Sequence, residues 1–88
     1  MAIYMEILAA LMQQPRLPTN LAQIVNVNLA RLDEYLGPLQ AASLIKRDKI
    51  DGHEVLAITN EGRNVWEDLY KIERRLNPVQ VKSNDGLP

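Results

Sequence analysis

The sequence predicts a single small domain that is mainly α-helical and contains one β-hairpin. This prediction depends on helical periodicity in four segments and on an Asp51-Gly52 pair between two short strand-like segments. Asp-Gly in that position indicates a hairpin, because a type I′ turn needs two residues that tolerate positive φ. The 88 residues, 47% of them hydrophobic, are enough for one core. We expect a folded domain over residues 1–76 and a disordered tail over 77–88.

Two short helices are predicted in the first third of the chain. The first spans residues 2–13 and places its apolar side chains on one face: Ile3, Tyr4, Ile7, Leu8 and Leu11. Pro15 and Pro18 end it, because a proline disfavours the helical conformation of the residue before it. Thr19 is predicted to cap the second helix through its hydroxyl group. This helix should end near Asn26 and bury three residues: Leu21, Ile24 and Val25.

A third helix is predicted to begin after Asn28, which can cap it. Four leucines mark its inner face: Leu29, Leu32, Leu36 and Leu39. Pro38 interrupts this pattern, because it has no amide hydrogen and its ring crowds the carbonyl four residues earlier. We expect a kink at Gly37-Pro38, or a break followed by a new segment that ends near Leu44. The hairpin strands are expected at residues 46–50 and 54–58.

The last helix is predicted to begin after Thr59, another capping residue, and to run to about Leu76. Its apolar stripe consists of Val65, Leu69, Ile72 and Leu76, and an adjoining stripe consists of Trp66, Tyr70 and Glu73. Because a small monomer cannot bury both, we expect a homodimer through this helix. The predicted interface residues are Trp66, Leu69, Tyr70 and Leu76. The alternative is that Trp66 packs within its own chain, against Tyr4 or the hairpin.

Short motifs at the ends of these elements point to a known family. They are Thr19, Asn26-Val27-Asn28-Leu29, Tyr35-Leu36-Gly37-Pro38-Leu39, Leu44-Ile45 and Thr59-Asn60-Glu61-Gly62. In these motifs the chain resembles the small archaeal winged helix-turn-helix proteins, the DNA-binding domains of transcriptional regulators and chromatin-associated proteins. A glycine usually precedes the Leu-Ile pair in that family, whereas this chain has Ser43. The resemblance implies four helices with a two-stranded wing before the last one.

The resemblance also implies binding of double-stranded DNA, with the third helix in the major groove and the wing on the backbone. The candidate DNA-binding residues are Asn28 and Arg31 in the helix, and Lys46, Arg47, Lys49 and His53 in the wing. Arg31 can form two hydrogen bonds with guanine, and Asn28 can read adenine. Arg16, before the second helix, is a weaker candidate for a backbone contact. Alternatively, Arg31 forms an ordinary ion pair with Glu34, and the wing cations only protect an edge strand from aggregation.

Charge and composition limit the other classes of function. The sequence has no cysteine and a single histidine, so we expect no metal site, no cofactor and no enzymatic activity. No segment resembles a membrane span or a secretory leader, so a cytoplasmic protein is expected. The net charge of −1 and Glu34 favour an alternative function, a winged-helix module that binds another protein in a larger assembly. The predicted function is a dimeric DNA-binding transcriptional regulator.

Overall fold

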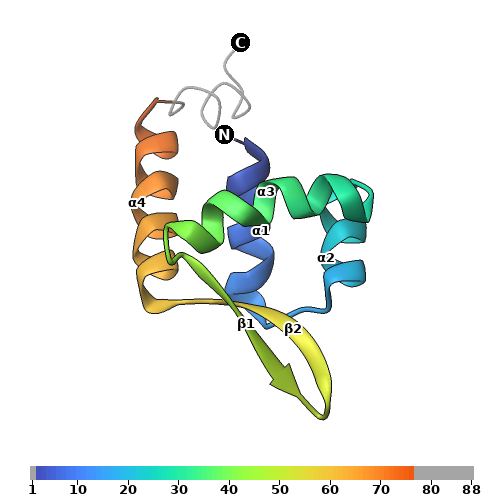
Figure 1. Ribbon diagram of the computed structural model, residues 1–88. Coiled ribbons are helices and arrows are strands. Elements are labelled where there is room, and N and C mark those ends of the chain that lie inside the picture. Colours follow the sequence, from blue (N-terminus) through green and yellow to red (C-terminus); the bar gives the residue numbers. More distant parts are fainter. Residues whose placement is uncertain (1, 77–88) are drawn as a thin grey trace.

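The computed structural model describes residues 2–76, which form four helices and one two-stranded antiparallel sheet (Figure 1). In chain order the elements are α1 (Ala2–Gln13), α2 (Pro18–Val25), α3 (Leu29–Ala41), β1 (Ile45–Ile50), β2 (His53–Ile58) and α4 (Asn60–Leu76). The predicted order of four helices with a hairpin before the last is confirmed. The predicted disordered tail, residues 77–88, lies outside the described residues.

The hydrophobic core lies around α1, which is behind α3 and between α2 and α4 (Figure 1). Its largest fully buried side chains are all aliphatic: Ile7, Leu8, Leu11, Leu21, Leu32, Leu36 and Leu56. Within residues 2–76, no polar or charged side chain is buried. Burial of apolar surface, at about 25 cal/mol per Å², is therefore the main force that holds the helices on the base of the hairpin.

The start of α2 differs from the prediction. Leu17 occupies the N-cap position without a side-chain cap, so the prediction that Thr19 caps this helix is wrong. Pro18 stands in the first turn, where its fixed φ suits a helix and its missing amide hydrogen costs nothing. α2 buries Leu21 and Val25 as predicted, together with Ala22. Ile24, which we expected inside, is 50% exposed.

α3 is one continuous helix. Its predicted cap is confirmed, since Asn28 Oδ1 accepts a hydrogen bond from the Arg31 amide at 2.8 Å. The helix continues through Gly37 and Pro38, so the predicted break does not occur. Gly37 allows the helix to continue, because it has no Cβ to clash with the proline ring. The first leucine of the predicted inner face, Leu29, is 44% exposed, and that assignment is wrong.

α2 and α3 each end with a residue in the left-handed conformation. These residues are Asn26, with φ 62°, and Ser43, with φ 61°. After α3 the Ser43 amide donates to the Gln40 carbonyl, and the Leu44 amide donates to the Leu39 carbonyl, both at 2.9 Å. This pattern is a Schellman motif, in which glycine is the usual left-handed residue. Ser43 therefore carries a steric cost of about 1–2 kcal/mol that a glycine would avoid.

The hairpin has the predicted turn. Asp51 and Gly52 have φ values of 52° and 80°, as a type I′ turn requires. The strands begin one residue earlier than predicted, and their register pairs Ile45 with Ile58 and Ile50 with His53. The last four residues of β2 and the first residue of β1 are buried, so the tip of the hairpin extends from the core into solvent.

Arg16 joins the segment between α1 and α2 to the outer edge of β2. Its amide donates to the Leu56 carbonyl at 3.0 Å, and the Leu56 amide donates to its carbonyl at 2.8 Å. The guanidinium Nε donates to the Ala10 carbonyl at 3.0 Å. Arg16 is half-buried. These bonds give it a structural role, which makes it a poor candidate for the DNA contact considered from the sequence.

The start of α4 is fixed by Thr59 and Gly62. The Thr59 hydroxyl accepts a hydrogen bond from the Gly62 amide at 2.9 Å, which confirms the predicted cap. The same hydroxyl donates toward the carbonyl oxygens of Ser43 and Leu44, at 2.7 and 3.1 Å. A Cβ on Gly62 would lie 2.1 Å from the Leu44 oxygen. Only glycine therefore allows α4 to pack this closely on the end of α3.

Candidate nucleic-acid interface

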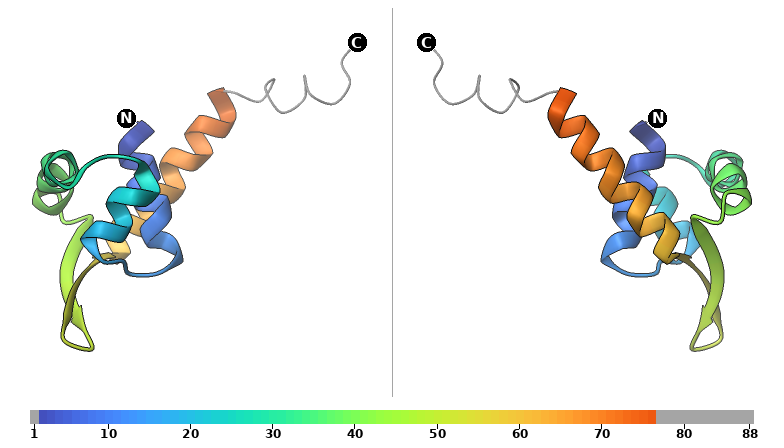
Figure 2. Two further views of the ribbon diagram at one scale, coloured as in Figure 1. Left: turned by 90° about the vertical axis from the view of Figure 1, so that its right-hand side faces the viewer. Right: turned by 90° about the vertical axis from the view of Figure 1, so that its left-hand side faces the viewer.

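α3 and the hairpin lie along the same side of the molecule. Figure 2 shows both at one edge, whereas the C-terminal half of α4 points away on the other side. A single extended ligand can therefore contact α3 and the hairpin together and leave the end of α4 free. The six candidate DNA-binding residues belong to these two elements: Asn28 and Arg31 to the start of α3, and Lys46, Arg47, Lys49 and His53 to the hairpin.

The outward face of α3 contains small residues and one carboxylate. It consists of four exposed residues: Ala30, Glu34, Gly37 and Ala41. They lie opposite the buried leucines of α3, because an α-helix turns by about 100° per residue. Glu34 is the only one of the four whose side chain is charged or forms hydrogen bonds.

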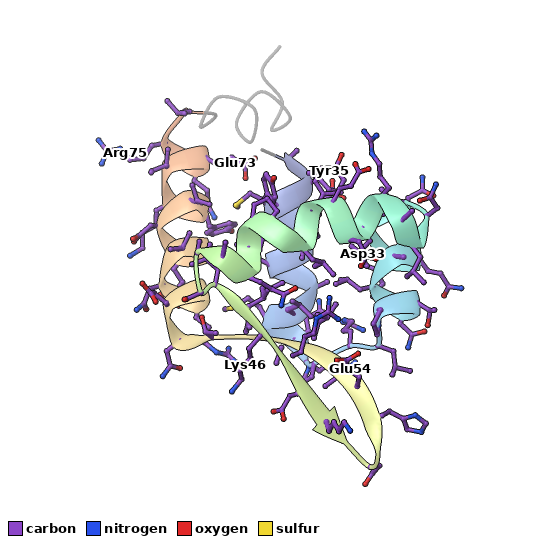
Figure 3. The ribbon with its side chains drawn as sticks, viewed as in Figure 1. Asp33, Tyr35, Lys46, Glu54, Glu73 and Arg75 are labelled. Atoms are coloured by element: carbon purple, nitrogen blue, oxygen red, sulfur yellow. The ribbon has the colours of Figure 1, made fainter. Side chains whose placement is uncertain are left out.

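Arg31 lies at the edge of α3 that faces α1. Its guanidinium carbon is 5.7 Å from the centre of the Tyr35 ring, which in turn packs edge-on against Tyr4 of α1 at 5.8 Å. Figure 3 shows Tyr35 on this edge of α3 and Asp33 on the other, toward the hairpin. In the part of the chain that the structure describes, no ion pair joins Arg31 to Glu34, so that alternative is wrong. The aromatic ring one turn away holds the arginine instead.

Asn28 has a structural task at the start of α3. Its Oδ1 is the acceptor of the helix cap described above. A two-bond contact with adenine uses both the oxygen and the amide nitrogen of an asparagine. The adenine contact predicted for Asn28 would therefore compete with the cap.

Arg47 and Lys49 share one face of the hairpin with Glu54. Lys49 is directly opposite Glu54 in the strand register, and Arg47 Nη1 is 3.9 Å from Glu54 Oε1. An exposed pair at this distance contributes at most about 1 kcal/mol to stability. It nevertheless places a carboxylate between the two cations predicted to bind phosphate. Our sequence reasoning missed Glu54, although the two-residue turn at Asp51-Gly52 already sets it opposite Lys49.

Lys46 and His53 lie toward opposite ends of the hairpin. Lys46, labelled in Figure 3, is near its base and is paired in register with Ala57. His53 is next to the turn and is paired with Ile50. At about 3.4 Å per residue Lys46 and His53 are separated by roughly 13 Å along the strands, too far to bind one phosphate group together. His53 also lines an open pocket of about 390 Å³, whose opposite wall includes residues 14–17.

The apolar residues of α4 become more exposed toward its C-terminal end. Trp66 is half-buried against the core and stacks on Tyr70, with ring centres 5.1 Å apart. Tyr70 is 40%, Ile72 51% and Leu76 75% exposed. Trp66 therefore packs in part on the core of its own chain.

An apolar pocket of about 260 Å³ lies beside the first half of α4. It is lined by Tyr4, Leu8, Pro38, Leu39, Leu44, Val65 and Leu69. Leu69, a half-buried residue of the predicted interface, lines this pocket on the side of the exposed end of the helix. Leu69, Ile72 and Leu76 follow one another at helical spacing, so the apolar stripe of α4 extends toward its C-terminal end.

The family of the chain follows from comparison with known proteins. The model of the winged helix-turn-helix family matches residues 1–77. The chain belongs to the winged helix-turn-helix family. This membership, together with the fold, confirms the family and the architecture predicted from the sequence. Among curated proteins, none matches this winged-helix chain by sequence.

Several solved winged-helix structures are similar to it. The transcriptional regulator BldR from Sulfolobus solfataricus has a TM-score of 0.82 and 23% identity, over 92% of this chain and 60% of that one. A transcriptional regulator from Thermotoga maritima has a TM-score of 0.71 and 26% identity, over 97% and 61%. A homodimeric winged helix-turn-helix DNA-binding domain from Mycobacterium bovis has a TM-score of 0.73 and 18% identity, over 85% and 71%. The chain thus spans about three fifths of the length of the two regulators.

Two further features of the described residues bear on the expected partners. None of the helices over residues 2–76 has the length and apolar character needed to cross a membrane. Over the same residues, no group of three or more His, Cys, Asp or Glu side chains is placed to hold a metal ion.

Proposed function

We propose that this winged-helix protein binds double-stranded DNA as a dimeric transcriptional regulator in the cytoplasm, and that it is not an enzyme. α3 enters the major groove and the hairpin lies on the phosphate backbone. The observation that carries this proposal is the placement of α3 and the hairpin along one side, with exposed cations on both. The regulators with similar structures support the function by analogy of fold.

The wing supplies the contacts that are independent of DNA sequence. Lys46, Arg47 and Lys49 are all exposed, and Glu54 partly neutralises only one face of the hairpin. Phosphates carry no sequence information, so these residues add affinity and orientation rather than base preference. Arg31, held by Tyr35 at the edge of α3, is the cation through which α3 contacts a phosphate in the same way.

A salt titration of duplex binding tests the proposal. A dimer in which Arg31, Arg47 and Lys49 of each protomer contact phosphates neutralises about six charges, so log K should fall with log salt with a slope of about −5. Fluorescence anisotropy with a labelled duplex at several salt concentrations measures this slope. Failure to bind any duplex at low salt would refute the proposal.

The dimer is proposed to form through α4 of two copies of the chain. The apolar face that packs on α1 continues to Ile72 and Leu76, where α4 diverges from the body (Figure 2). A second copy related by two-fold symmetry presents the same face and can cover it. The Mycobacterium bovis domain of the same fold is a homodimer, which supports this assembly. Tyr70 and Leu69 extend the surface toward the core.

Leu76→Asp is the variant that tests this interface. Leu76 is 75% exposed, so its replacement should leave the folded protomer intact while placing two carboxylates within the dimer contact. Asn64→Asp is the matched control, because it adds the same charge at an exposed position of the same helix. Sedimentation should show a dimer for the wild type and the control, and a monomer for Leu76→Asp. A monomeric wild type well above micromolar concentration would refute the dimer.

The charges of α3 favour one second candidate, a module that binds another protein. α3 contains Asp33 and Glu34 against a single cation, Arg31. Such a surface is unusual for a helix that approaches phosphates. The salt titration separates the two candidates, because a protein-binding module would show no affinity for duplex DNA.

A further inference from the structure

Glu34 occupies the position on α3 where a DNA-reading helix makes its base contacts. It is exposed on the outward face, in the first half of the helix, with Ala30 one turn before it and Gly37 one turn after it. In a helix-turn-helix, the residues in the first part of the recognition helix are the ones that reach base edges. The small neighbours allow the helix to approach the groove closely, so a side chain as long as glutamate can reach a base.

The other polar residues near this face are engaged or lie at its edges. Arg31 is drawn toward α1 by Tyr35, Asn28 caps the helix, and Asp33 lies on the edge near the hairpin. In residues 2–76 Glu34 makes no ion pair and no side-chain hydrogen bond. Its carboxylate is therefore free to bind a ligand at the centre of the face.

A carboxylate in the major groove selects strongly among base edges. Guanine and thymine present acceptors there, which repel it, and adenine presents an amine beside the N7 acceptor. Cytosine presents only an N4 amine, which donates to a carboxylate. The surrounding phosphates repel the carboxylate at every position, so only a site that provides such a donor offsets the repulsion.

We propose that Glu34 is a specificity-determining residue that accepts a hydrogen bond from the N4 amine of a cytosine. This assignment rests on the proposed function, because it requires α3 to lie in the major groove. It gives the two carboxylates of α3 different roles. Glu34 selects a base, whereas Asp33 only weakens binding to every sequence.

Selection from a random duplex library tests the assignment. The wild type should select a cytosine at one position of each half-site, and a mismatched base pair there should weaken binding by about 5- to 150-fold. Glu34→Ala should lose this preference while its binding to mismatched duplexes becomes stronger. Glu34→Gln should shift the preference toward adenine, whose N6 and N7 a glutamine can bind together.

Asp33→Asn is the matched control, since it removes one negative charge from the adjacent residue of the same helix. It should strengthen binding to all duplexes and keep the selected cytosine. If Glu34→Ala selects the same cytosine as the wild type, Glu34 has no role in specificity, although the proposed function stands. If the wild type binds no duplex at low salt, the proposed function fails and this assignment fails with it.

Discussion

Replacing Gly62 with alanine should destabilise the fold far more than a single methyl group normally does. The new Cβ would lie 2.1 Å from the Leu44 carbonyl oxygen and 2.7 Å from Ile58 Cγ1. The oxygen cannot move easily, because it belongs to the backbone and accepts a hydrogen bond from the Thr59 amide at 3.0 Å. The start of α4 must therefore move away from the end of α3.

The cost can be worked from these contacts. Overpacking of a dense region costs about 1–3 kcal/mol, and the hydrogen bonds of Thr59 to the Ser43–Leu44 turn contribute about 1 kcal/mol each. The higher helix propensity of alanine offsets about 1 kcal/mol of this loss of stability. A net loss of about 3 kcal/mol corresponds to a fall in Tm of roughly 12–24 °C for a domain of this size.

Thermal unfolding followed by circular dichroism measures this loss, at one protein concentration because a dimer has a concentration-dependent Tm. Gly37→Ala is the control, since a Cβ at Gly37 meets no atom within 4 Å beyond its chain neighbours. Its propensity gain is opposed by the clash with Pro38, so its stability should stay within about 0.5 kcal/mol of the wild type. A Tm for Gly62→Ala within about 3 °C of the wild type would refute the close packing of α4 on α3.

Three further variants test separate features. Ser43→Gly should raise stability by about 0.5–1 kcal/mol, because glycine adopts the left-handed conformation without strain; urea unfolding checks this, and a loss of stability would contradict the strain. Asn28→Ala should lose about 1 kcal/mol with its helix cap, and Asn28→Ser should retain most of it; equal loss in both would show that the cap contributes nothing. Glu54→Gln should strengthen binding to all duplexes alike and steepen the salt dependence, because it frees Arg47 and Lys49. Anisotropy titrations with two unrelated sequences measure both effects, and an unchanged affinity would show that the hairpin does not contact the DNA.

Local signals in the sequence predicted the element boundaries well. The cap residues Asn28 and Thr59 and the turn at Asp51-Gly52 each satisfy backbone groups within a few residues, so their effect is independent of tertiary packing. The prediction that Thr19 caps α2 is wrong for an equally local reason. Pro18 has no amide hydrogen that needs a partner and can begin the helix itself.

Apolar periodicity predicted the core less completely. Ile24 and Leu29 fit the pattern of an inner face, but Ile24 lies beside the buried stripe of Leu21, Ala22 and Val25, and Leu29 is the first residue of α3. Periodicity identifies an apolar stripe and leaves open how far along the helix it is covered. The same limit applies to α4, whose stripe is covered near Val65 and open at Leu76.

The partner of the charged residue Arg31 could be assigned only from the structure. The sequence allows Arg31 to pair with Glu34 or with Tyr35, three or four residues away, and only the position of Tyr4 on α1 selects the tyrosine. The strand register, which the turn already fixes, instead puts Glu54 opposite Lys49 and diagonally across from Arg47, its ion-pair partner. The position of Glu54 opposite Lys49 could therefore have been predicted from the sequence.

The balance of charges on this surface makes the proposed dimer a requirement for useful affinity. Each protomer brings few cations to the DNA, and Glu34, Asp33 and Glu54 oppose them. Affinity from phosphate contacts alone is therefore small, and a single protomer would dissociate readily from any sequence. Two protomers joined through α4 place two wings and two copies of α3 on one duplex, so the second half-site is bound at a high effective concentration. Leu76→Asp should consequently weaken binding to a two-part site much more than to a single half-site. Equal losses on both duplexes would show that each protomer binds alone.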